Sequence, residues 1–154
     1  MTEEGRISAH QGPHVRPAIA KLRRGEPSAR CAAPPPPALV QGIEQFNRGE
    51  FFAQHETLEA AWIAETDPVR YLYQGILQIG VGFYHLTRGN SYGARRLWAR
   101  GVALLQPFRA GCMNVDVDAL VGETERCIVA LDRTNSADGD GFDWSLAPRV
   151  RWLT

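Results

Sequence analysis

The chain has 154 residues, of which 44% are hydrophobic, and its 17 basic side chains balance 17 acidic ones. These values suit one globular domain with an appendage. A net charge of zero provides no field that would attract nucleic acid or an anionic membrane, so we expect neither as a partner. No apolar run approaches the roughly 18 residues of a membrane-spanning helix. The N-terminus lacks the apolar core of a secretory signal, so none is expected.

Three cysteines, Cys31, Cys112 and Cys127, lie far apart in the sequence and form no C-x-x-C pair. Their odd number argues against a disulfide framework, and their spacing argues against a zinc knuckle. We therefore expect reduced thiols, which are typical of a cytoplasmic location.

Residues 1–37 differ in composition from the rest of the chain. They carry scattered Gly, Arg and Pro residues and end in four consecutive prolines at positions 34–37. Such a run favours the polyproline II conformation and cannot continue a helix. The composition predicts a disordered N-terminal extension over residues 1–37.

From Ala38 onward the spacing of apolar residues is helical and predicts an all-α fold, a single compact bundle of about five helices over residues 38–133. The expected helices span residues 38–48, 50–65, 68–88, 91–108 and 116–132. The third is apolar almost all round, which is typical of the buried centre of a bundle. Residues 134–154, a polar Gly-rich loop followed by a segment with Pro148, are expected to form an extended tail laid on the bundle.

Two helix corners share a pattern forty residues apart. Both place Arg-Gly between two expected helices, with Gly49 at the first corner and Gly89 at the second, and an aromatic residue follows three positions later. The pattern is similar to the hairpin turn of tetratricopeptide-type repeats, which would make the chain a protein-interaction module. The alternative is that two corners use the same turn chemistry.

The expected second helix carries an unusual polar group on its apolar side. Each helical residue advances by about 100°, which places Glu59 about 40° from His55. Phe51 and Trp62 fall within a similar angle on the same side, so His55 and Glu59 are expected in the middle of the apolar face. Glu56, about 100° round, is expected near its edge.

Two interpretations of this group stay open, because a buried carboxylate is costly unless it is hydrogen-bonded or paired. His55 and Glu59 could bond to each other and to neighbouring helices, which would fix the register of the bundle. Alternatively, they could form half of a metal site or an acid–base pair. Gln74, Gln78 and His85 share one face of the third expected helix, and that face either meets the group or is simply solvated.

A resemblance emerges from the run that extends from Phe46 through His55, Glu56 and Glu59 to Trp62. Together with Gln74-Gly75, the apolar run to His85, Gly89-Asn90 and Gly93-Ala94, it resembles the signature of the bacterial and archaeal domain of unknown function 309 family. The resemblance covers residues 38–110. It implies a compact all-α domain without a known activity, and the positions that it highlights are His55, Glu56, Glu59, Trp62, Gln74 and His85.

Three functions remain compatible with the sequence, and whether the chain is an enzyme stays open. The first is a structural or ligand-binding helical domain that needs no cofactor. Its ligand-binding or buried polar cluster would comprise His55, Glu56, Glu59, Trp62, Gln74, Gln78 and His85. The second is a divalent-metal enzyme, such as a hydrolase, with His55, Glu59 and His85 as ligands. The third is the interaction module, for which a protein partner or a second copy of the chain would be bound.

Overall fold

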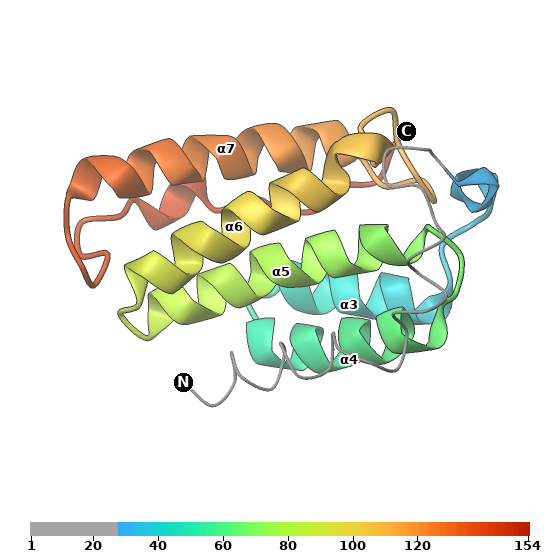
Figure 1. Cartoon of the computed structure of the whole chain (residues 1–154), viewed down its shortest axis with the longest axis horizontal. Helices are drawn as coiled ribbons and strands as arrows, with labels where there is room; N and C mark the ends of the chain where they lie inside the picture. Colours follow the sequence, from blue (N-terminus) through green and yellow to red (C-terminus); the bar gives the residue numbers. More distant parts are fainter. Residues whose placement is uncertain (1–27) are drawn as a thin grey trace.

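The computed structural model describes residues 28–154, and within them the chain forms five α-helices joined by short connections. These are α3 (Pro37–Asn47), α4 (Phe51–Ala64), α5 (Arg70–Thr87), α6 (Ser91–Leu105) and α7 (Val117–Thr134). Three short 3-10 turns accompany them: η1 (Ala29–Ala32), η2 (Gln106–Phe108) and η3 (Trp144–Leu146). Figure 1 shows α4, α5, α6 and α7 following one another across the molecule in chain order, with α3 behind α4 and α5. The predicted all-α bundle is confirmed.

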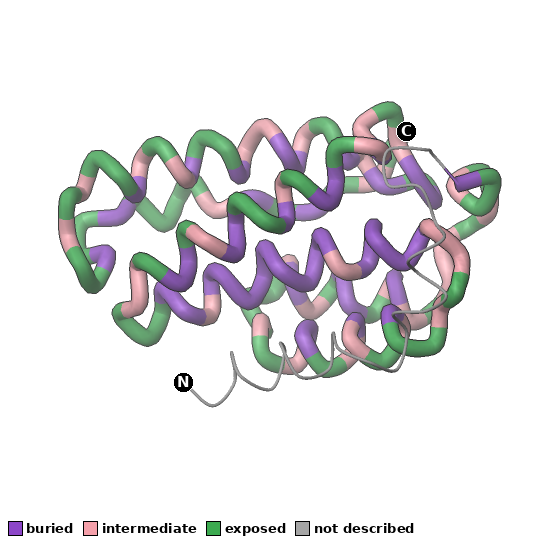
Figure 2. The backbone as a smooth tube through the Cα atoms, viewed as in Figure 1, coloured by how far each residue is buried: buried purple, intermediate pink, exposed green. Residues whose placement is uncertain are grey.

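Helix α5 is the centre of the bundle, as its apolar sequence predicts. All of its residues except Gln74, Tyr84 and Thr87 are buried, and its tube is correspondingly almost uniform in colour in Figure 2. It packs against α4 on one side and against α6 on the other. A helix with two neighbours needs apolar residues around most of its circumference, which explains the pattern. None of the helices in residues 28–154 is long and apolar enough to cross a bilayer.

Glycines let α5 and α6 approach closely. A Cβ at Gly75 would lie 2.6 Å from the Leu105 side chain, and one at Gly101 would lie 2.6 Å from Ile79. Cβ atoms are not found this close to other atoms. The side chains of Leu105 and Ile79 therefore occupy the space that a side chain at Gly75 or Gly101 would need. The sequence pattern alone did not distinguish these glycines from helix-weakening ones.

The two corners that look alike in sequence also fold alike. Gly49 and Gly89 both adopt positive φ, 78° and 75°. The residue after each glycine donates to a carbonyl five residues back, Glu50 N to Gln45 O and Asn90 N to His85 O, both at 2.9 Å. This is the hydrogen bond of a Schellman motif, and a left-handed residue at that point is most easily glycine. The α3–α4 and α5–α6 hairpins therefore share their turn chemistry.

Two predicted helix boundaries shift for local reasons. Helix α5 begins at Arg70 rather than at Pro68, because the Asp67 side chain accepts a hydrogen bond from Val69 N at 2.9 Å and holds a turn there. Helix α6 ends at Leu105, and the chain continues as the 3-10 turn η2, which contains Pro107. Proline removes the backbone donor that an α-helix would use at this position.

The N-terminal extension and the cysteines require a correction. Residues 28–36, expected to be disordered, are ordered: Ser28 is buried, η1 follows it, and Cys31 is disulfide-bonded to Cys112. Residues 1–27 of the predicted extension lie outside the described residues. The expectation of three reduced thiols is wrong for this pair, and Cys127 is a free, buried thiol. Cys31 and Cys112 are 81 residues apart in sequence, so their pairing could not be predicted from local spacing and follows only from the fold.

The C-terminal segment is an extended tail on the bundle, as predicted. Asn47 at the end of α3 exchanges two hydrogen bonds with the Val150 backbone, at 3.0 and 2.8 Å. Further along, Val115 forms a bridge with Trp152, and Asp116 N donates to Arg151 O at 2.8 Å. The tail thus joins α3 to the segment that precedes α7.

Candidate functional site

The buried face of α4 consists of Gln54, His55, Leu58 and Trp62. Gln54 and Leu58 are fully buried, whereas the side chain of Glu59 keeps 14% of its exposure. His55, 4% exposed, lies on the buried face as expected, whereas Glu59 lies at the edge of that face rather than in its middle.

His55 and Glu59 are paired along their own helix. His55 Nε2 lies 3.6 Å from Glu59 Oε1, one turn on, and the pair becomes an ion pair only when the histidine is protonated. Residues at this spacing are neighbours on a helix surface. Glu56, the third polar residue of the sequence pattern, is exposed. The pattern therefore separates into one adjacent pair and one solvent-facing carboxylate.

Gln54 belongs to this region, although the sequence analysis did not single it out. Its amide lies against the backbone of α5, since a Cβ at Gly80 would be 2.6 Å from Gln54 Nε2 and 2.8 Å from its Oε1. Nε2 donates to Phe51 O at 3.2 Å, while Oε1 is buried without a hydrogen-bond partner in the described structure. Gln54 lies three residues after Phe51 and four before Leu58, and this spacing places it on the same helix face as those two apolar residues. The sequence could therefore have indicated that Gln54 is buried.

On α5, Gln78 and His85 are buried and Gln74 is partly exposed. The three positions share one face of the helix. The alternative of a solvated face is therefore wrong for Gln78 and His85. Gln78 Oε1, like that of Gln54, is buried and has no hydrogen-bond partner among residues 28–154.

Aromatic rings connect the two histidines. The ring of Phe52 lies 6.1 Å from that of His55 and 5.8 Å from that of Tyr84, between ring centroids. Tyr84 in turn lies 6.5 Å from His85. These separations fall within the range of ordinary aromatic contacts. The row of four rings crosses from α4 to α5, so His55 and His85 stand at its two ends.

Trp62 lies at the other end of α4 and packs against a buried cation. The guanidinium of Arg70 sits 4.7 Å from the centroid of the indole. Its Nε donates to Glu65 O at 2.7 Å and its Nη2 to Trp62 O at 2.9 Å. Burial lowers the pKa of Arg70 from its ordinary value. Because a cation is favourable at a helix C-terminus and satisfies its last carbonyls, Arg70 stabilises the end of α4.

The structure does not assemble the metal site of the alternative interpretation. Across residues 28–154, no group of three or more His, Cys, Asp or Glu side chains is arranged to hold a metal ion. His55, Glu59 and His85 therefore do not converge as ligands among the described residues.

Comparison with known proteins finds a family whose helices are similar to part of this chain. Residues 39–97, from α3 into α6, match the family described as "Domain of unknown function (DUF309)", which confirms the resemblance seen in the sequence. "Uncharacterized protein YpuF" of Bacillus subtilis (strain 168) is 34% identical over 85 residues, which are 54% of this chain and 49% of that protein. The match thus spans about half the length of this relative. No solved structure matches. Every candidate residue named above lies within the matched segment.

Proposed function

We propose that the domain of unknown function 309 carried by this chain binds a small polar ligand beside α4 and α5. The binding site that we propose, here called the polar cluster, consists of His55, Glu59, Gln78 and His85. Trp62, Gln74 and Glu56 flank it. Nothing in this proposal requires a metal or a covalent step.

One observation carries the proposal: Gln78 Oε1 is a buried acceptor without a partner among the described residues. Leaving such a group unsatisfied costs about 1–3 kcal/mol of folding free energy. Gln78 shares its face of α5 with His85, whereas Gly80, on which Gln54 packs, lies about 200° around the helix from Gln78. An unsatisfied acceptor beside a buried histidine suits a group that is kept for a ligand.

The chemistry of the acceptors indicates the class of ligand. Amide oxygens and a carboxylate accept hydrogen bonds, so a molecule rich in N–H donors fits them best. Glu59 adds a carboxylate that is still partly exposed and can be reached from solvent. A small amine or amidine would donate hydrogen bonds to an amide oxygen and to the carboxylate together.

Stability measurements on Gln78→Leu test whether the amide is kept for binding. If Gln78 is unsatisfied in the free protein, the apolar replacement removes the cost and raises the free energy of unfolding by about 1 kcal/mol. The matched control is Gln74→Leu, which changes a partly exposed residue of the same face and should shift stability by less than about 0.5 kcal/mol. A loss of more than about 1 kcal/mol in Gln78→Leu would instead assign the residue a structural role.

Native mass spectrometry provides the direct test. Protein purified without denaturation should carry a small molecule that is released on unfolding, and Gln78→Leu should carry less of it. Unliganded protein in both cases, with no shift in thermal unfolding on adding small amines such as putrescine, would contradict the proposal.

We also propose a cytoplasmic location, supported by the free thiol of Cys127. Disulfides in that compartment are usually transient or redox-sensing, so the bond between Cys31 and Cys112 would then depend on the local redox state. Labelling of the thiols in intact cells before lysis would test this: protection from a membrane-permeant reagent at both cysteines, under all conditions, would argue against it.

A further inference from the structure

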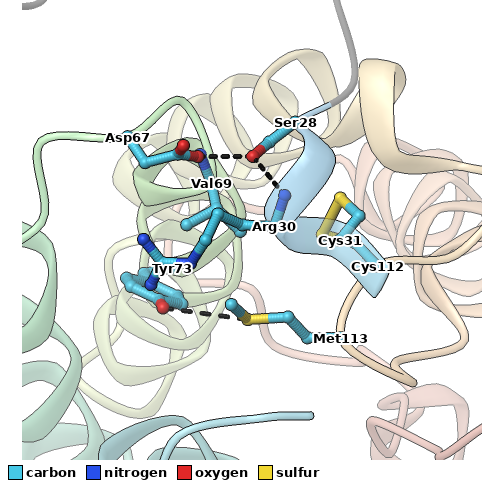
Figure 3. Close-up of a disulfide and its surroundings, with 8 residues drawn as sticks. All are labelled: Ser28, Arg30, Cys31, Asp67, Val69, Tyr73, Cys112 and Met113. Carbon is cyan, nitrogen blue, oxygen red and sulfur yellow. Dashed lines mark hydrogen bonds between the residues drawn. A yellow bond between two sulfur atoms is a disulfide. The ribbon is translucent and has the colours of Figure 1, made fainter. Parts of the chain in front are cut away.

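Residues 28–32, here called the strap, join two loops that are distant in sequence. On one side the Ser28 hydroxyl donates to Asp67 Oδ1 at 2.5 Å, and Arg30 pairs with Glu65 at 3.0 Å. Both acceptors lie in the connection between α4 and α5. Figure 3 shows the strap passing from Asp67 toward Cys112.

On the other side the strap is attached to the connection between η2 and α7. Cys31 forms the disulfide with Cys112, and Met113 N donates to Cys31 O at 2.8 Å. Met113 Sδ in turn accepts a hydrogen bond from the buried Tyr73 hydroxyl at 3.8 Å. The strap therefore bridges the start of α5 and the start of α7 on the outside of the bundle.

The disulfide is the strongest of these attachments. The pair of Arg30 and Glu65 leaves the arginine side chain 47% exposed, and solvent screening makes such a pair contribute little. The bonds of Ser28 and of the Cys31 carbonyl are single neutral or charge-assisted hydrogen bonds. Among the described residues, these bonds and the packing of Cys31 against the core would remain without the covalent link, in a segment that has few buried residues of its own.

Both cysteines lie outside residues 39–97, so the link lies outside the segment that matches the family. Its two sulfurs differ in access, since Cys31 is partly exposed whereas Cys112 is 1% exposed. A reductant from solvent therefore reaches Cys31 first.

We propose that the strap is a thiol-controlled device, fastened in the oxidised protein and released when a dithiol reduces Cys31–Cys112. A thiolate of the dithiol attacks Cys31 Sγ, the bond between the two protein sulfurs breaks, and Cys112 leaves as a thiolate that takes up a proton. The second thiol of the reductant then displaces Cys31. Two electrons and two protons pass to the protein, and the dithiol becomes a disulfide.

Limited trypsin digestion reports on the state of the strap. Arg30 is exposed, but trypsin can cut the peptide bond between Arg30 and Cys31 only when the strap detaches and enters the active site of the protease. Dithiothreitol should accelerate cleavage after Arg30 at least tenfold, as followed by the fragment that begins at Cys31. Cleavage after Arg100, exposed within α6, should stay unchanged and shows that the bundle is folded.

Three variants complete the test. Cys31→Ser and Cys112→Ser should each be cut as fast as the reduced protein and should not respond to dithiothreitol, whereas Cys127→Ser should behave like the natural chain. Thiol titration of the unfolded, unreduced protein should give one thiol per chain. Three thiols per chain, equal cleavage rates with and without reductant, or equal acceleration after Arg30 and Arg100 would each overturn the proposal.

Discussion

Trp98 on α6 occupies the space that a side chain at position 82 of α5 would need. A Cβ at Gly82 would lie 2.4 Å from Trp98 Cδ1 and 3.0 Å from the carbonyl oxygen of Ala94. Trp98 is fully buried and lies 4.6 Å from the ring of Phe83, between centroids. The missing side chain at Gly82, like those at Gly75 and Gly101, thus lets the two central helices come close together.

Gly82→Ala is expected to destabilise the protein by about 1–3 kcal/mol, the usual range for overpacking, despite the helix propensity that alanine adds. Urea unfolding measures the change. Gly122→Ala in α7 is the matched control, since nothing lies within 4 Å of its added methyl group. It should stabilise by about 0.5–1 kcal/mol. If both variants gained stability, the close approach of α5 and α6 would be disproved.

Trp62→Ala should lower the free energy of unfolding by about 3–5 kcal/mol, as large-to-small changes in a core do. The indole is 3% exposed, and its loss would also leave the Arg70 guanidinium without its aromatic neighbour. Ile63→Ala changes the next residue of α4, which is 38% exposed, and should cost far less. Chemical denaturation compares the two. A loss below about 1 kcal/mol in Trp62→Ala would be inconsistent with the packing described.

Glu59→Gln should leave the protein folded and change its stability by less than about 1 kcal/mol. The pair with His55 lies on one helix at 3.6 Å and is partly exposed, and such pairs contribute a few tenths of a kcal/mol. The exposed Glu56→Gln is the control for loss of charge on the same helix. Thermal and urea unfolding provide the comparison. A loss above about 2 kcal/mol, seen only in Glu59→Gln, would show that the carboxylate is a structural necessity.

The thiol of Cys127 should resist alkylation in the folded protein well above pH 9. Burial raises its pKa to about 12, and the thiol donates to Leu146 O at 3.4 Å. In the unfolded chain the thiolate forms from about pH 9, whereas in the folded chain it forms only near pH 12. The unfolded state therefore binds fewer protons in this window, and the contribution of Cys127 to stability, complete below pH 9, is lost as pH rises.

Iodoacetamide at pH 9.5, half a unit above the ordinary thiol pKa of 9.0, should react with the unfolded chain at least a hundred times faster than with the folded one. Urea unfolding at pH 8 and pH 10 should show a steeper loss of stability in the natural chain than in Cys127→Ala. Rapid native alkylation, or identical pH dependence in both proteins, would contradict the burial of this thiol.

The sequence by itself determined which segments are helical and which helix is central. Apolar spacing of 3.6 residues, the glycines at the two corners and the continuous apolar surface of α5 are local signals, because they follow from the geometry of one helix. The residue run from Phe46 to Trp62 was likewise enough to indicate the family. These features can be predicted without knowing which helices pack against each other.

Only the tertiary structure decided the partners. Gln54 lies buried on Gly80 because α4 meets α5 at that point. Cys31 and Cys112 are 81 residues apart in sequence and meet only because the strap crosses from the start of α5 to the start of α7. Helix periodicity fixes the angle of a side chain around its own axis, but the position of a neighbouring helix or loop depends on how all the surfaces pack together.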